Sequence, residues 1–86
     1  MTEDFCMYYV YILKSLNHPE QSYVGLTSNL NARLQKHNEG GCPHTSKYKP
    51  WKIAWYSAFE DKYKALQFET YLKSHSGKAF TSKRLI

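Results

Sequence analysis

The stretch that most constrains the fold is the apolar run MYYVYILKS, which covers residues Met7–Ser15. It is rich in tyrosine, valine and isoleucine, and these residue types favour β-strands. Alternate side chains of a strand point to opposite faces of the sheet. The alternation gives one face of Tyr9, Tyr11 and Leu13 and a second face of Tyr8, Val10 and Ile12. Because both faces are apolar, the run predicts a central strand that is covered on both sides.

The segments that follow alternate turn signals with strand and helix patterns. LNHPEQ, residues 16–21, contains Asn and Pro and predicts a turn. SYVGLT, residues 22–27, predicts a second strand, and the short connection favours an antiparallel hairpin. Ser28 or Asn29 can cap the helix after it, and Gly40 and Gly41 end that helix.

The second half of the chain predicts one more strand and one more long helix. Residues 42–50 are polar and basic and indicate a loop or a short helix. Residues 51–60 alternate enough for a third strand, and a long helix begins at Asp61 and ends at Gly77. The expected order is β-β-α-(α or loop)-β-α, an α+β fold with a small three-stranded antiparallel sheet flanked by helices.

A chain of 86 residues predicts one domain. We expect a disordered N-terminus over residues 1–6, the domain over residues 7–80 and a basic C-terminal tail over residues 81–86. No apolar run approaches the ~18 residues of a membrane span. Two cysteines without a signal peptide favour a cytoplasmic protein with free thiols. Cys6, Cys42 and His44 lack the paired spacing of a zinc site, so we do not expect zinc.

Each predicted long helix carries charge on its apolar face. Arg33 and His37 share a face with two leucines, so both point toward the sheet. Glu69 lies within the apolar stripe of the last helix. A charged group on a core-facing stripe needs a partner or a function.

These residues together suit phosphodiester chemistry. Tyr11 and Tyr23 fall on neighbouring strands of the predicted hairpin, beside the helix of Arg33 and His37. Mg²⁺ keeps most of its waters and needs only one or two carboxylates plus substrate phosphate, which Glu69 can satisfy. A planar guanidinium suits the charge that develops on phosphoryl oxygens.

A structural explanation is also open for each of these residues. The two tyrosines can be core rings, and His37 can bond a backbone group. Arg33 can form an ion pair with Glu69 or Glu39. Glu69 can pair with Lys73 four residues further along its helix.

The chain resembles the GIY-YIG nuclease superfamily over about residues 7–80. YVY (residues 9–11) and YVG (residues 23–25) stand where that superfamily has its two triplets, and Arg33, His37 and Glu69 follow in order. The first triplet departs from the motif because Tyr9 stands where a glycine is common. Valine also replaces isoleucine in both triplets.

The resemblance implies divalent-metal-dependent cleavage of one phosphodiester strand, with Mg²⁺ or Mn²⁺ held by Glu69. Arg33 would stabilise the transition state, and Tyr11 would be the general base. Tyr23 and His37 would orient the water or the phosphate.

Further residues receive supporting roles. Gly25 is expected to be structural and to open room beside Tyr23. Asn29 matches the asparagine that commonly opens the helix in this superfamily. The residues expected to contact nucleic acid, without reading its bases, are Asn29, Lys47, Lys49, Lys52, Lys83 and Arg84.

The formal net charge of +5 favours an anionic partner, and nucleic acid is favoured over a membrane surface. We therefore expect a metal-dependent nuclease that acts on nucleic acid, with DNA favoured over RNA. Its specificity would come from this chain or from a protein partner. A module that binds nucleic acid, cuts poorly and recruits a partner is the main alternative. A basic domain that binds only protein is a third.

Overall fold

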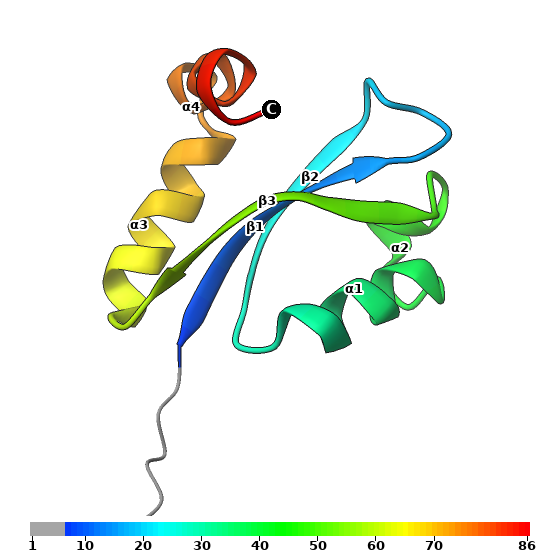
Figure 1. Ribbon diagram of the computed structural model, residues 1–86, viewed down its shortest axis with the longest axis horizontal. Coiled ribbons are helices and arrows are strands. Elements are labelled where there is room, and N and C mark those ends of the chain that lie inside the picture. Colours follow the sequence, from blue (N-terminus) through cyan, green and yellow to red (C-terminus); the bar gives the residue numbers. More distant parts are fainter. Residues whose placement is uncertain (1–6) are drawn as a thin grey trace, which may run out of the picture.

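The computed structural model describes residues 7–86, so the disorder expected for residues 1–6 lies outside the described residues. Three strands, β1 (Tyr8–Ser15), β2 (Ser22–Thr27) and β3 (Trp51–Phe59), form one sheet in the order β2-β1-β3. Both pairings are antiparallel. Strand β1 is central, as its two apolar faces predict, and β2 is an edge strand (Figure 1).

Helices account for most of the remaining chain. Their bounds are α1 (Leu30–Asn38), α2 (Pro43–Ser46), α3 (Lys62–Lys73), α4 (His75–Phe80) and a π-helical turn, η1 (Thr81–Leu85). The side chain of Asn29 caps α1, because its Oδ1 accepts the Ala32 N–H at 3.0 Å. Asp61 caps α3 in the same way. Within residues 7–86, no helix combines the length and the apolar character that crossing a bilayer requires.

The two faces of β1 belong to two separate cores. On one face, Val10 and Ile12 pack with Ala65 and Leu72 of α3. The opposite face carries a second cluster of Tyr11, Leu13 and Trp51, against which Leu30 and Leu34 of α1 pack. Figure 1 shows the result, with α3 and α4 on one side of the sheet and α1 and α2 on the other. The predicted sheet flanked by helices is confirmed.

The C-terminal part differs from the expectation of one long helix followed by a tail. Helix α3 ends at Lys73, because Ser74 takes up an extended backbone and its Oγ accepts the Gly77 N–H at 3.0 Å. Gly77 then lies inside α4 rather than at a helix end. Residues 81–85 are helical, and Leu85 packs against the α3-side core. This segment, expected as a basic tail, is therefore part of the folded unit.

Gly77 is required by a close approach of two backbones. A Cβ built at this position would lie 1.8 Å from the Tyr71 carbonyl oxygen and 2.6 Å from the Leu72 Cα. No side-chain rotation can relieve a contact with backbone atoms. The glycine therefore fixes the angle at which α4 leaves α3.

We predict that Gly77→Ala lowers the free energy of unfolding by about 1–3 kcal/mol, because the added methyl group overpacks this contact. Urea unfolding of the two proteins measures the difference. Ser76→Ala is the matched control, since Ser76 is the exposed neighbour in the same helix. Equal stabilities of the two variants would contradict the role given to Gly77.

Candidate active site

The site begins at Tyr11, whose ring lies against Gly25 of the edge strand. The two residues are directly opposite in the β1–β2 register. A Cβ at Gly25 would lie 2.3 Å from the Tyr11 hydroxyl oxygen, so the phenol fills the space that the glycine leaves. The space that Gly25 is expected to open beside Tyr23 is occupied by the Tyr11 phenol. With 1% exposure, Tyr11 is almost fully buried.

The buried hydroxyl of Tyr11 starts a chain of hydrogen bonds. It lies 3.1 Å from Nε2 of His37, which is itself 1% exposed. The second ring nitrogen of His37, Nδ1, lies 2.7 Å from the Thr45 hydroxyl of α2. Thr45 donates that hydroxyl to the Cys42 carbonyl oxygen at 3.2 Å.

The end of this chain fixes the direction of every proton in it. A carbonyl oxygen can only accept, so the Thr45 hydroxyl donates to Cys42 and accepts from His37 Nδ1–H. His37 Nε2 is then left as an acceptor for the Tyr11 O–H. The arrangement therefore aims the phenol proton at an imidazole nitrogen that is ready to receive it.

Thr45 has no signal in the sequence that singles it out. It lies eight residues after His37, in a polar segment without periodicity, and only the fold brings it to the imidazole. Trp51 Nε1 donates to the Thr45 carbonyl oxygen at 2.8 Å, which fixes α2 against the sheet. The Asn38 side chain also bonds both backbone polar groups of Trp51 and so holds the end of α1 beside β3.

Arg33 is half-buried and lies close to the Tyr11 hydroxyl. Among residues 7–86 it forms no ion pair with a carboxylate within 4.0 Å. The two partners that a structural explanation would give it are engaged elsewhere, since Glu39 accepts from Gln35 and Glu69 pairs with Lys73. Its positive charge therefore acts on the tyrosine and histidine.

The environment sets the protonation states of this group. Burial raises the pKa of Tyr11 to about 12, and the nearby Arg33 guanidinium opposes that rise. Burial also lowers the pKa of His37, and the positive charges of Arg33 and Lys36 lower it further. At neutral pH the pair consists of a protonated phenol and a neutral imidazole, which agrees with the hydrogen-bond direction.

Tyr23 completes the group on the α1 side of the sheet. Its ring centroid lies 6.4 Å from that of Tyr11 and 5.1 Å from that of His37. The fold thus brings four of the five predicted catalytic residues, Tyr11, Tyr23, Arg33 and His37, into one cluster. The hairpin and α1 alone supply them.

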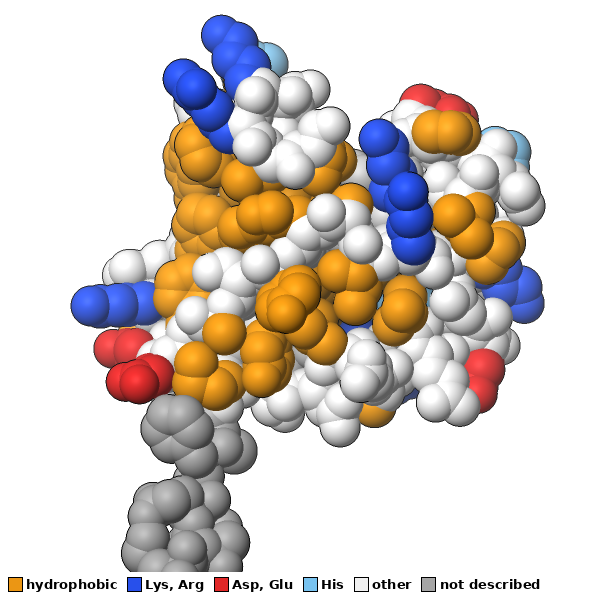
Figure 2. Space-filling model, in the orientation of Figure 1, with side chains coloured by type: hydrophobic (Ala, Val, Ile, Leu, Met, Phe, Trp, Pro, Cys, Tyr) orange, Lys and Arg blue, Asp and Glu red, His pale blue; other side chains and the backbone are white. Residues whose placement is uncertain are grey.

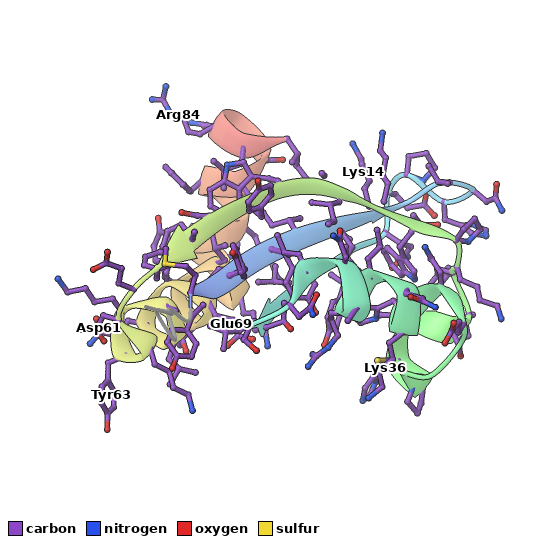
Figure 3. All side chains as sticks on the ribbon, turned by 60° about the horizontal axis from the view of Figure 1, so that its bottom comes forward. Lys14, Lys36, Asp61, Tyr63, Glu69 and Arg84 are labelled. Atoms are coloured by element: carbon purple, nitrogen blue, oxygen red, sulfur yellow. The ribbon has the colours of Figure 1, made fainter. Side chains whose placement is uncertain are left out.

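Glu69 comes from α3, which packs against the opposite face of the sheet (Figure 3). Its carboxylate is 3.1 Å from the Lys73 ammonium, and its side chain is 17% exposed. Among the described residues, no hydrogen bond, ion pair or aromatic contact joins Glu69 to the Tyr11 cluster. The structure therefore leaves the fifth predicted residue on the far side of β2.

A hard divalent cation that keeps most of its waters needs few donors from the protein. Over residues 7–86 no three His, Cys, Asp or Glu side chains are grouped to hold a metal ion. One carboxylate, Glu69, is what Mg²⁺ or Mn²⁺ needs from the protein when a substrate phosphate supplies further oxygens. Lys73 would have to leave the carboxylate first.

The residues predicted to contact nucleic acid are spread over the molecule. Asn29 serves as the α1 cap. Lys47 lies 5.9 Å from the centroid of the Tyr48 ring, and Lys49 is close to Gly40, both on the α2 side. Lys52 lies in β3, and Lys83 and Arg84 lie in η1, where Arg84 projects away from the sheet (Figure 3).

Comparison with known proteins decides the family. A model described as the GIY-YIG catalytic domain matches residues 7–84. The chain belongs to the GIY-YIG family. Both triplets and the cluster around Tyr11 lie within the matched residues.

Relatives of this GIY-YIG chain fall into two kinds. A UPF0213 protein of Clostridium perfringens is 41% identical over 68 residues, which cover 78% of this chain and 71% of that protein. The structure-specific endonuclease subunit SLX1 of Debaryomyces hansenii is 41% identical over 69 residues, but these cover 72% of this chain and only 20% of SLX1. The solution NMR structure of a UPF0213 protein from Bacillus halodurans matches with a TM-score of 0.55 and 29% identity, over 92% of this chain and 86% of that one.

We predict that His37 is neutral at pH 7, with its proton on Nδ1, and that it titrates below its ordinary pKa of about 6.5. Nitrogen-15 NMR of the imidazole reads the tautomer and the titration directly. Observation of the proton on Nε2 would contradict the hydrogen-bond direction derived above.

The same shift makes stability depend on pH. Because the folded pKa lies below the unfolded one, the unfolded chain binds more protons as the pH falls below about 6.5, and the free energy of unfolding decreases. Urea unfolding at about pH 7.5 and about pH 5.5 should show a larger decrease for the native chain than for His37→Gln. Equal decreases in the two proteins would contradict the buried neutral imidazole.

Proposed function

We propose that this GIY-YIG chain is a divalent-metal-dependent nuclease that hydrolyses phosphodiester bonds, with DNA preferred to RNA. The observation that carries the proposal is the buried series of hydrogen bonds from Tyr11 through His37 to Thr45. Arg33 lies beside it and, among the described residues, forms no ion pair with a carboxylate. A purely structural tyrosine does not need an imidazole held in one tautomer. Family membership supports the same reaction.

The hydrogen-bond directions support the following proton movements. A water attacks phosphorus and transfers a proton to the Tyr11 oxygen, while the Tyr11 proton passes to His37 Nε2 and the bond from phosphorus to the leaving oxygen breaks. The two transfers are coupled because a phenol with a pKa of about 12 does not ionise on its own at neutral pH. His37 becomes an imidazolium whose Nδ1–H stays bonded to Thr45.

The remaining groups act on the phosphate. Arg33 donates to the phosphoryl oxygens as their negative charge increases. Tyr23, packed against the His37 ring, orients the phosphate or the water. When Mg²⁺ or Mn²⁺ is bound at Glu69, it supplies Lewis-acid polarisation of the phosphodiester and stabilises the leaving oxygen.

A second function is favoured by one observation, the ion pair between Glu69 and Lys73. If the Glu69 carboxylate stays paired with Lys73, the chain would bind nucleic acid and recruit a partner without cutting.

The SLX1 relatives are named structure-specific endonuclease subunits, so our proposal includes branched DNA as a substrate and a protein partner. The experiment below separates cutting from binding.

We predict that Glu69→Gln and Tyr11→Phe each reduce strand cleavage by about 100-fold or more while leaving binding within about threefold. The assay uses labelled single-stranded, duplex and branched DNA and RNA with Mg²⁺, with Mn²⁺ and with a chelator. Glu60→Gln is the control, because it removes the same charge from an exposed carboxylate.

The possible outcomes separate the two functions. Loss of cleavage in Glu69→Gln but not in Glu60→Gln supports the nuclease. If the native chain and Glu69→Gln bind alike and neither cuts any substrate, while circular dichroism shows both folded, the binding module is the correct function.

Thr45 is a positioning residue, and we predict that Thr45→Val lowers the cleavage rate by at least about tenfold, because His37 loses the acceptor that fixes its tautomer. Thr45→Ser keeps the hydroxyl and should restore the native rate and pH profile. If the Thr45→Val and Thr45→Ser variants cleave at the same rate, the Thr45 hydroxyl has no part in the reaction.

A further inference from the structure

A pocket with a volume of about 650 Å³ lies on the α3 side of the sheet, between the end of the β1–β2 hairpin and the C-terminal helices. Figure 2 shows the molecule hollowed between these two parts. Its apolar lining residues are Ile12, Val24, Leu72, Pro19 and Ile86. Ile12 and Leu72 are buried, so they form a floor rather than a rim.

The charged side chains that line this pocket are mainly lysines. Its lysines are Lys14 from β1, Lys73 from the end of α3 and Lys78 from α4, against one carboxylate, Glu20. Its hydroxyl groups come from Ser22, Thr81 and Ser82. Ammonium and hydroxyl donors around an apolar floor suit a ligand that carries both an anionic group and a flat apolar part.

Strand pairing adds a further positive charge beside the pocket. Lys14 lies directly opposite Lys52 in the β1–β3 register, so both ammonium groups extend from the same face of the sheet. Like charges in this position destabilise a sheet. An anion bound at Lys14 would reduce the repulsion between these two ammonium groups.

The pocket is contiguous with the candidate active site. Tyr23, one of the clustered tyrosines, is also a lining residue of the pocket. Lys73, another lining residue, holds the Glu69 carboxylate. The pocket and the Tyr11 cluster therefore share Tyr23 of the edge strand, and Lys73 links the pocket to Glu69.

We propose that this pocket binds one unpaired nucleotide of the substrate strand, with its phosphate at Lys14 and Lys78 and its base over the apolar floor. The assignment rests on the proposed function, since it names how the nucleic acid is held next to the cleavage site. A paired base has its faces inside the duplex stack, so the apolar floor of the pocket can contact the face of a base only outside the stack. The pocket would therefore favour substrates that have a single-stranded segment beside the bond that is cut.

The experiment measures binding by fluorescence anisotropy with a single-stranded DNA of about twelve nucleotides and with the blunt duplex of the same sequence. A chelator is present throughout, so the result does not depend on cleavage. The native chain is compared with the double variant Lys14→Gln/Lys78→Gln. Lys62→Gln/Lys64→Gln is the control, because it removes equal charge from exposed positions at the other end of α3.

We expect the pocket double variant to bind the single strand about tenfold or more weakly, and the slope of log affinity against log salt to fall by about 0.7 for each lost phosphate contact. Duplex affinity should match that of the control. Ser82→Trp, which fills the pocket without changing charge, should weaken single-strand binding to a similar degree.

Two results would overturn the proposal. Equal single-strand affinities of the pocket and control variants would exclude the lysines as phosphate ligands. Native affinity in Ser82→Trp would show that the nucleotide stays outside the pocket. A chain that binds as expected but cuts no substrate would refute the nuclease and leave the pocket standing, so the two failures are distinguishable.

Discussion

The fold depends on one strand, β1, being buried on both faces. Its even-numbered residues build the core with α3, and its odd-numbered residues build the cluster with α1. Each face has a separate requirement. The α3 side needs only apolar packing, whereas the α1 side buries a phenol and therefore needs a hydrogen-bond partner for its hydroxyl. His37 supplies that partner, and the chemistry of the site follows from this pairing.

Strand β2, one of the two edge strands, lies between the Tyr11 cluster and the helix of Glu69. The Tyr11 cluster is on one face of the sheet and Glu69 is on the helix that covers the other. A phosphodiester that meets both must therefore cross the open edge of β2. Tyr23 belongs to that strand, and it is shared by the aromatic cluster and the adjoining pocket.

Local periodicity predicts that Tyr11 and Tyr23 lie on neighbouring strands and that Arg33 and His37 share a helix face. Their assignment to one site rests on the resemblance to the GIY-YIG superfamily. Thr45 could not be predicted, since its position depends on how α2 packs against Trp51. The end of α3 was also beyond local reasoning. Glycine is typical of helix ends, so the sequence predicts a helix end at Gly77. The close approach of Gly77 to the Tyr71 backbone depends on how α4 packs against α3. The pocket lysines come from three different elements and share no sequence pattern.

The ion pair between Lys73 and Glu69 has a thermodynamic consequence. The carboxylate oxygen that the ammonium contacts cannot bind a metal ion fully until the ammonium leaves, and the freed ammonium already stands at the wall of a pocket suited to phosphate. Metal binding would then increase affinity for the strand. By linkage, the strand would increase affinity for the metal to the same degree. Transfer of Lys73 from the Glu69 carboxylate to a phosphate would couple binding of the proposed metal ion to binding of the proposed substrate.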